Sequence, residues 1–328
     1  QSLEEKGYTY IISDGVYFDT SKFKDYATFA HLDIEGLKSG ARVEENNEKK
    51  SITDFALWKF SPKNETRDME WDSPWGTGFP GWHIECSAMS KKYLGTHFDI
   101  HTGGIDHIPV HHTNEIAQSE CANGETYVNY WMHNNFLNDQ TGKMSKSKGD
   151  FLRMQTLIDE HIPPLAFRYH LYTTHYRSEL NFSLESLKAS AQAYDKLITF
   201  VKSQNGKEGT PNETYKTNFE EATFNDLGTP QAIALIWKLL KDDTVTDEDK
   251  TATLFLYDEI LGLNLKALSL EETAALDIPD EVENLLSLRK IARDTKNWAE
   301  SDRLRDEIHI RGFSVKDTQE GQELSKSL

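Results

Sequence analysis

The chain of 328 residues contains only two cysteines, Cys86 and Cys121, which excludes a fold held together by a framework of disulfide bonds. It contains no uninterrupted run of about 18 apolar residues, the length that a membrane-spanning helix needs. It also shows no basic segment followed by an apolar one after Gln1, so we see no secretory leader. These absences predict a cytoplasmic protein without membrane partners, and the length leaves room for two or three domains.

Positive charge is also in short supply. The chain has 36 lysines and arginines against 54 aspartates and glutamates, a net charge of −18 and a pI near 5.1. Such an acidic chain is not a general nucleic-acid binder. Residues 143–202 are the exception, because their basic side chains are interleaved with histidines and tyrosines. If the protein binds RNA, we expect this stretch to contact it, and solvated helix faces are the competing interpretation.

The first half of the sequence predicts a mixed α/β architecture. Residues 8–19 alternate aromatic and β-branched residues around turn formers, which indicates a hairpin. Residues 71–81 are too rich in Pro and Gly for a helix or a strand. The segments that follow are predicted to be a helix at 82–94, a strand at 98–101, a helix at 114–121 and a strand at 127–137. Two strand-to-helix steps in this order are typical of half of a parallel, doubly wound sheet.

From Met154 onward the apolar pattern is helical to the end of the chain, so the second half is predicted to be all-α. Three-to-four spacing of apolar residues is clearest at 184–201 and 232–240. A helical hairpin is expected at 281–311, followed by a frayed tail. The best linker candidate is 205–213, with its glycines and proline, and the next is 268–279.

Residues 143–147 read Lys-Met-Ser-Lys-Ser, the most informative segment of the chain. Lys143 and Lys146 stand three residues apart, beside two hydroxyls and before Gly149. Such a loop can close over a polyphosphate, because the ammonium groups supply charge while hydroxyls and backbone amides supply directional donors. A match of five residues is not specific by itself. The evidence that this motif binds phosphates therefore depends on the segment upstream of it.

Cys86, His111 and Glu115 form the sharpest candidate metal set. His111 and Glu115 are four residues apart at a predicted helix start and therefore share one face, while Cys86 lies on a separate predicted helix. A thiolate, an imidazole and a carboxylate suit zinc better than magnesium, and three protein ligands leave one position open for chemistry. The competing interpretation is a core cysteine, an ordinary histidine pair and a solvated glutamate.

The turn after the predicted strand at 98–101 carries a candidate nucleotide site. Gly103 and Gly104 let a ligand approach the backbone closely, and Asp106 can hold ribose hydroxyls. Many strand-to-helix turns share this pattern. Trp82, at a predicted helix start, is either a lid over a ligand or a core residue.

These segments follow the order and spacing of the signature motifs of cysteinyl-tRNA synthetases, which the chain resembles over nearly its whole length. The likeness is carried by Gly81–Met89, Asp99–Asp106, His111–Glu120, Tyr130–His133 and Lys143–Ser147. Residues 54–58 and 71–75 extend it upstream, and residues 293–302 resemble the C-terminal helical tail of that family.

The resemblance implies a class I aminoacyl-tRNA synthetase, with a Rossmann catalytic domain, a connective insertion and a helical anticodon-binding bundle. It divides this chain into a connective-peptide insertion (1–80), the second half of the Rossmann domain with the Lys-Met-Ser-Lys-Ser loop (81–152), a helical stem-contact region (153–204), an anticodon-binding bundle (205–275) and a C-terminal helical hairpin with a tail (276–328). The implied substrates are cysteine, ATP with Mg²⁺, and tRNA(Cys), and the implied state is monomeric.

The resemblance also assigns roles to single residues. It places one zinc ion per subunit on Cys86, His111 and Glu115, with a further cysteine as the fourth ligand. Trp82 matches a residue that closes over the substrate cysteine, and His101 matches one that lines the same pocket. It further implies that adenosine contacts Gly103, Gly104 and Asp106, and that Lys146, with Lys143 in the same loop, stabilises the ATP phosphates.

Two departures from the family pattern affect the interpretation. The first zinc cysteine and the His-Ile-Gly-His signature would stand before Gln1, so we expect this chain to be the C-terminal part of a longer protein and to be inactive alone. The family's Phe-Pro-His-His-Glu is Pro-Val-His-His-Thr at residues 109–113, which leaves the candidate ligands in place.

The preferred function is cysteine–tRNA ligase. One alternative is an ATP-dependent cysteine ligase of thiol biosynthesis, which the long helical region after Met154 disfavours because such an enzyme needs no anticodon domain. The other is a non-catalytic tRNA-binding remnant. Cysteine-dependent pyrophosphate exchange separates these possibilities.

Overall fold

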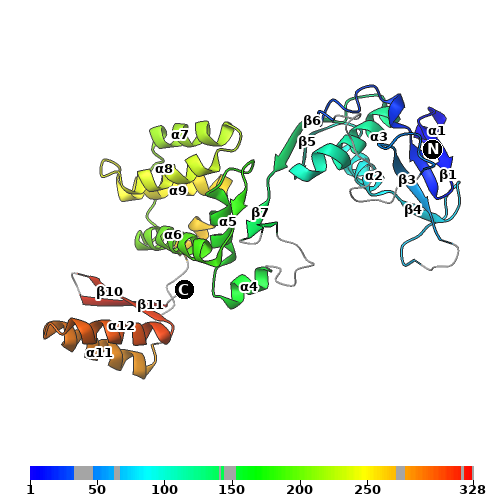
Figure 1. Cartoon of the computed structure of the whole chain (residues 1–328). Helices are drawn as coiled ribbons and strands as arrows, with labels where there is room; N and C mark the ends of the chain where they lie inside the picture. Colours follow the sequence, from blue (N-terminus) through cyan, green and yellow to red (C-terminus); the bar gives the residue numbers. More distant parts are fainter. Residues whose placement is uncertain are drawn as a thin grey trace. The chain divides into compact units, whose positions relative to one another are not determined.

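The structure is a computed structural model that describes residues 1–32, 47–62, 67–139, 142–143, 153–270, 278–318 and 321–326. The chain divides into two compact units (Figure 1). The first unit consists of residues 1–136 with 176–179, and the second of residues 137–175 with 180–328. Each unit is described by itself.

The first unit begins with an antiparallel sheet of four strands in the order β1-β2-β3-β4. The elements are α1 (Ser2–Glu5), β1 (Thr9–Ile12), β2 (Gly15–Phe18), the 3₁₀ turn η1 (Thr20–Lys22), β3 (Phe55–Phe60) and β4 (Gly78–Pro80). The predicted hairpin at 8–19 is confirmed as β1 and β2. Gly15 is required where β2 meets β3, because a Cβ atom there would lie 2.2 Å from the carbonyl oxygen of Trp58.

Strand β4 corrects the expectation that residues 71–81 contain neither helix nor strand. Its residues pair with β3, from Trp58 with Pro80 to Phe60 with Gly78. Pro80 is tolerated because β4 is an edge strand, where one row of backbone N–H groups needs no partner. Gly78 allows the close approach to β3, since a Cβ atom would lie 2.1 Å from the carbonyl oxygen of Lys59.

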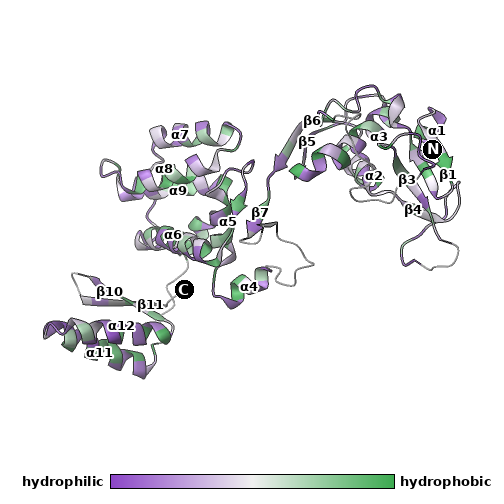
Figure 2. Cartoon of the chain, in the orientation of Figure 1, coloured by the Kyte–Doolittle hydropathy of each residue, from purple (hydrophilic) through white to green (hydrophobic). Residues whose placement is uncertain are grey.

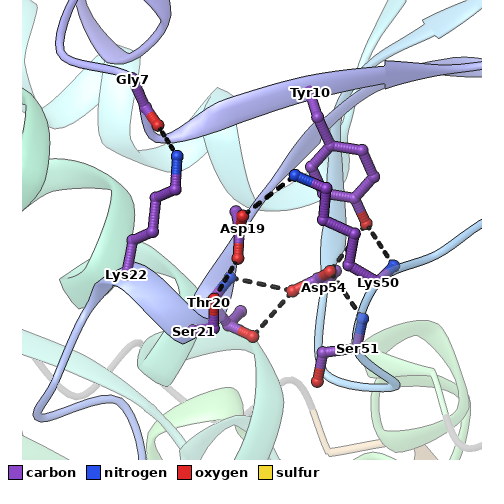
Figure 3. A network of polar contacts seen from close by, with 9 residues as sticks. All are labelled: Gly7, Tyr10, Asp19, Thr20, Ser21, Lys22, Lys50, Ser51 and Asp54. Carbon is purple, nitrogen blue, oxygen red and sulfur yellow. Dashed lines mark hydrogen bonds and ion pairs between the residues drawn. The ribbon is translucent and has the colours of Figure 1, made fainter.

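A buried carboxylate, Asp54, anchors the start of β3 (Figure 3). Its oxygens accept hydrogen bonds from the Tyr10 hydroxyl at 2.7 Å, from the backbone N–H and the hydroxyl of Thr20 at 2.9 and 2.8 Å, and from the Ser51 N–H at 2.9 Å. Because these four donors compensate the buried charge, Asp54 ties β1, η1 and the segment before β3 together. The next residue, Phe55, packs edge-on against His83 at 5.5 Å between ring centroids.

The rest of the first unit is a parallel strand pair with its helices. The elements are α2 (Trp82–Leu94), β5 (Phe98–Gly104), the short turns η2 (Ile105–His107) and η3 (Ile108–His112), α3 (Thr113–Asn123) and β6 (Val128–Asn134). Strands β5 and β6 are parallel and in register from Phe98 with Val128 to Gly104 with Asn134. This confirms the first predicted strand-to-helix step, from β5 to α3, whereas β6 is followed by the strand β7 and not by a helix. The register also brings the glycine turn of β5 beside His133 of β6.

The second unit contains a helical bundle with a small sheet. Its elements are β7 (Leu137–Asp139), β8 (Gly142–Lys143), α4 (Met154–Asp159), α5 (Pro164–Tyr172), β9 (Leu180–Asn181), α6 (Leu184–Ser203), α7 (Glu213–Phe224), α8 (Thr229–Leu240), α9 (Asp247–Leu261) and α10 (Leu265–Leu270). The helices share one apolar core, in which the rings of Phe219 and Tyr257 stack at 4.0 Å. A capping box at Ser183 and Ser186 starts α6.

The C-terminal elements are α11 (Asp280–Asp294), α12 (Trp298–Ile310), β10 (Phe313–Thr318) and β11 (Gly321–Lys326). The predicted helical hairpin is present, but the expectation of helix and frayed tail to the end is wrong. Phe313, Val315 and Leu324 of the β-hairpin pack with Val282 and Ile308 in a small core of their own. Burial of these side chains outweighs the helical spacing that the sequence suggested.

Figure 2 shows hydrophobic and hydrophilic residues mixed along the helices of the second unit, with no helix apolar throughout. Among the described residues, no helix has both the length and the apolar character needed to cross a membrane.

Candidate functional site

The first unit brings the three predicted metal ligands together. Cys86 comes from the first half of α2, His111 from η3 and Glu115 from the first turn of α3. One ligand atom from each lies within 4.8 Å of the other two. The convergence that the spacing suggested is therefore present, and the role of these residues as zinc ligands stays a prediction.

Glu115 is the centre of this arrangement. Its side chain is 0% exposed, and Nε2 of His111 lies 2.6 Å from its Oε1. Its other oxygen, Oε2, lies 3.3 Å from Nε2 of His101 on β5. Neither oxygen accepts a well-aligned hydrogen bond from a described residue. A buried carboxylate in this condition is costly unless a cation compensates it, so the side chains fit a metal ion better than they fit a hydrogen-bonded network.

The thiol of Cys86 is half-buried and needs a cation to act as a thiolate. Burial raises its pKa, and the negative charge of Glu115 raises it further. A Zn²⁺ ion at this place would reverse both effects, because coordination deprotonates a thiol. Cys121, by contrast, is buried beside Ala117 in the apolar cluster of the first unit, and burial raises its pKa to about 11. It belongs to neither of the described ligand groups, which agrees with its exclusion on sequence grounds.

A group of histidines surrounds the candidate ligands. Nδ1 of His111 lies 2.9 Å from Nδ1 of His83, and Nδ1 of His112 lies 2.7 Å from Nε2 of His133. Burial lowers the pKa of His83 to about 4 and that of His112 to about 3, and it also lowers the pKa values of His101 and His133. The neutral rings can therefore accept a cation through one nitrogen and hydrogen-bond through the other.

Three of these histidines were not assigned a role from the sequence: His83, His112 and His133. Two of them had a local signal, since His83 follows Trp82 and His112 follows His111. His133 had none beyond its place in a matching motif, because only the register of β5 and β6 brings it to the site.

Trp82 begins α2, and its side chain is 59% exposed. It is therefore not a core residue. Its ring centroid lies 4.1 Å from that of His111, so the exposed indole lies beside one of the candidate metal ligands. This position is compatible with the predicted contact to a small substrate, and that contact stays a prediction.

The glycines of the candidate nucleotide turn have a structural role in the described residues. A Cβ atom on Gly103 would lie 2.5 Å from Cε1 of His112, and one on Gly104 would lie 2.5 Å from Oδ1 of Asp106. Packing against the buried ring of His112 thus requires Gly103, whatever ligand approaches it, whereas the exposed side chain of Asp106 could move away from a Cβ atom on Gly104. The turn nevertheless ends a parallel strand, the edge where nucleotide sites form in such sheets.

The structure does not describe the side chains of the two predicted catalytic lysines. Lys143 ends β8 in the second unit, and its side chain is not described. Lys146 falls outside the described residues. Their predicted contact with phosphates stays a prediction.

Comparison with known proteins identifies the class. Residues 1–192 match the family model described as the class I (C) tRNA synthetase catalytic domain, which covers more than half of the chain. Residues 276–324 match the model described as the cysteinyl-tRNA ligase anticodon binding domain. The chain thus combines the catalytic domain of a class I tRNA synthetase with an anticodon-binding domain.

Curated relatives narrow the class further. The chain is 49% identical over 326 residues to cysteine–tRNA ligase 1 of Burkholderia lata, covering 99% of this chain and 68% of the relative. It is 38% identical to the cysteine–tRNA ligase of Treponema denticola and 39% identical to that of Zymomonas mobilis, covering 96% and 97% of this chain and 70% of each relative. The chain belongs to the cysteine–tRNA ligase family.

Proposed function

We propose that this chain carries the cysteine-activating site and the tRNA-binding region of a cysteine–tRNA ligase. In the first step, the carboxylate of cysteine attacks the α-phosphate of ATP and pyrophosphate leaves. In the second step, a ribose hydroxyl of tRNA(Cys) attacks the aminoacyl carbonyl and AMP leaves. The observation that carries the proposal is the convergence of Cys86 and His111 on the fully buried carboxylate of Glu115, which accepts no aligned hydrogen bond from the residues that the structure describes.

The same three residues would hold zinc. A zinc ion there would offer an open position to the sulfur of the substrate, and the hydroxyl of serine is a far poorer ligand at neutral pH. His83 keeps the ring of His111 oriented through the contact between their Nδ1 atoms, so that Nε2 of His111 faces the carboxylate. Trp82 would cover the bound amino acid from the open side, and His101 would line the opposite wall.

The adenylation step needs no covalent nucleophile from the protein. Positioning of the two substrates and stabilisation of the phosphate charge account for such a reaction. Gly103, Gly104 and Asp106 are proposed to contact adenosine, and Lys143 and Lys146 to stabilise the phosphates. Mg²⁺ would accompany ATP.

The domain division is likewise a proposal: 1–80 a connective insertion, 81–152 the second half of the catalytic domain, 153–204 a stem-contact region, 205–275 a helical anticodon-binding bundle, and 276–328 the C-terminal hairpin. The family-model match at 276–324 supports a direct anticodon role for α11, α12 and the strands after them. In that region Trp298 is 56% exposed, and the guanidinium of Arg293 lies 5.6 Å from its ring centroid. An exposed indole beside an arginine is suited to stack on an unpaired base.

The anticodon-binding match also separates the preferred function from a cysteine ligase of thiol biosynthesis, which has no use for an anticodon reader. The non-catalytic alternative is tested by activity. The decisive material is a chimera in which this chain replaces the matched region of the Burkholderia lata relative. We expect the chimera to catalyse pyrophosphate exchange that depends on cysteine and ignores serine.

The natural Burkholderia lata enzyme is the control for assay conditions. A folded chimera without exchange, or one that accepts serine equally well, would contradict the proposed function. The chain alone is assayed beside it, and we expect no exchange from it. Exchange by the chain alone would refute only that last expectation.

A further inference from the structure

Glu115 belongs to two groups of potential ligands, and the proposed zinc site uses only one of them. One ligand atom each of His101, His112 and Glu115 lies within 4.8 Å of the others, as is the case for Cys86, His111 and Glu115. The second group joins the strand β5, the end of η3 and the start of α3. Its side chains are well shielded, with His101 15% exposed, His112 2% and Glu115 0%.

The carboxylate presents a different oxygen to each group. Oε1 lies 2.6 Å from Nε2 of His111, while Oε2 lies 3.3 Å from Nε2 of His101. Both oxygens are buried and lack an aligned hydrogen bond within the described residues. A single ion on the Oε1 side would leave Oε2 with only the His101 ring beside it and no aligned hydrogen bond from a described residue, which is unfavourable for a buried carboxylate oxygen.

His112 has one ring nitrogen held by an outer histidine. Its Nδ1 lies 2.7 Å from Nε2 of His133, which leaves Nε2 of His112 for a further partner. His111 repeats this pattern through His83, with an outer histidine at one nitrogen and Glu115 at the other. Histidines that ligate metals almost always have the second nitrogen held by an outer group.

An indole closes the second group on one side. The ring centroid of Trp131 on β6 lies 4.7 Å from that of His101 and 4.8 Å from that of His112. This aromatic wall limits the access of water and would strengthen the attraction between a cation and the carboxylate.

We propose that His101, His112 and Glu115 form a second cation site, in which Glu115 bridges two divalent ions of the zinc class. Two imidazoles and one carboxylate favour zinc, cobalt or nickel over magnesium. Carboxylate-bridged ions in proteins lie about 3.5–4 Å apart, a separation that one carboxylate can span. The proposal for the first ion rests on the proposed function. The proposal for the second ion is a separate prediction, that the chain binds two ions and not one.

The second ion would have a functional consequence. His101 is also proposed to line the pocket for cysteine, so an ion held by His101 would occupy space that the substrate needs. Metal in excess would then inhibit cysteine activation in the chimera, and substitution of His112 would relieve that inhibition.

Metal titration of the chain tests the proposal. Metal-free protein is titrated with Co²⁺, the number of bound ions is measured by native mass spectrometry, and the thiolate-to-cobalt charge-transfer band is recorded. The unchanged chain is expected to take up a second ion after the first. Cys86→Ser should lose the charge-transfer band and keep the second ion, His112→Gln should keep the band and lose the second ion, and Glu115→Gln should weaken both by at least tenfold.

His107→Gln is the matched control. The ring of His107 lies 5.2 Å from that of His111 and 5.3 Å from that of His112, yet His107 belongs to neither described ligand group, so the variant should bind both ions. If thermal unfolding shows that His112→Gln does not fold, His101→Gln replaces it. A chain that never binds more than one ion, or a folded His112→Gln that binds as many ions as the unchanged chain, overturns the proposal. Absence of the charge-transfer band together with an ion that depends on His112 would instead remove the Cys86 site.

Discussion

Helices α3 and α8 bury their faces in opposite ways. The buried residues of α8 are all apolar: Ala232, Ile233, Ile236 and Leu239. Those of α3 are mainly polar: Thr113, Asn114, Glu115, Gln118 and Ser119, with Ala117 and Cys121. Packing explains the first helix, since burial of aliphatic side chains is the main favourable term in folding. It does not explain the second.

Most of the polar side chains on α3 have partners. The Gln118 amide donates to the His83 carbonyl and to the Ser87 hydroxyl, both at 2.6 Å, and the Tyr26 hydroxyl donates to Asn114 at 2.5 Å. Gln118 still has one oxygen, Oε1, without a partner among the described residues, but Glu115 differs from it because both oxygens of a charged group lack aligned donors there. The comparison teaches that a buried carboxylate with neither oxygen satisfied, lying among potential metal ligands, marks the candidate site better than the polar helix as such.

The largest expected effect separates the two cysteines of the first unit. Cys86→Ser in the chimera should lower cysteine-dependent pyrophosphate exchange by at least about 100-fold, because a hydroxyl does not replace a thiolate as a zinc ligand. Cys121→Ser should leave exchange within a few-fold, because Cys121 packs in the apolar cluster away from the ligands. Exchange rates and zinc content of both variants are measured together, and equal zinc loss in the two would remove Cys86 from the site.

Substitutions on α8 and α3 test whether the first helix serves packing and the second serves metal binding. Leu239→Ala, at a fully buried position of α8, should lower the free energy of unfolding by about 2–5 kcal/mol and leave metal affinity unchanged. Glu115→Gln should weaken metal binding and make the metal-free chain more stable, because it removes a buried charge that has no aligned donor among the described residues. Urea unfolding of the two metal-free variants measures their stabilities, and metal titration measures their affinities. A strongly destabilised metal-free Glu115→Gln would show that the carboxylate serves packing.

Acidification should destabilise the metal-free first unit. His83 has an ordinary pKa of 6.5 and a folded pKa of about 4, so the unfolded chain binds the proton more tightly. Stability is therefore complete above pH 6.5 and is lost as pH falls towards 4, by about 2–3 kcal/mol for this residue. In thermal melts, His83→Gln should reduce the loss of stability between pH 6.5 and pH 4. If stability falls as steeply with pH in the variant as in the unchanged chain, protonation of His83 is not the cause.

The smallest effect concerns the C-terminal hairpin. Trp298→Ala should weaken tRNA(Cys) binding by about 1–3 kcal/mol, the range for loss of one stacking partner of a base. Cysteine-dependent pyrophosphate exchange by the chimera carrying Trp298→Ala should not change, because that reaction does not require tRNA. Filter binding compares this variant with Ile310→Ala, which also removes an exposed apolar side chain, 83% exposed, from α12. Equal losses from both would argue against stacking at Trp298.

Local sequence spacing predicted the parts of the site that lie within one element. His111 and Glu115 share a face because they are four residues apart. The β1–β2 hairpin is present at the turn residues that predicted it. The order of the motifs likewise indicated the family that the comparisons show. These features depend on neighbours in the chain, so the sequence alone determines them.

Only the tertiary structure decided the features that depend on distant pairing. The register of β5 with β6 places His133 beside the glycine turn, and tertiary packing brings His133 against His112, a member of the second ligand group. The C-terminal β-hairpin became visible only when its apolar side chains met Val282 and Ile308 in a common core. Such contacts join residues far apart in the chain, and their energy depends on burial that no local pattern contains.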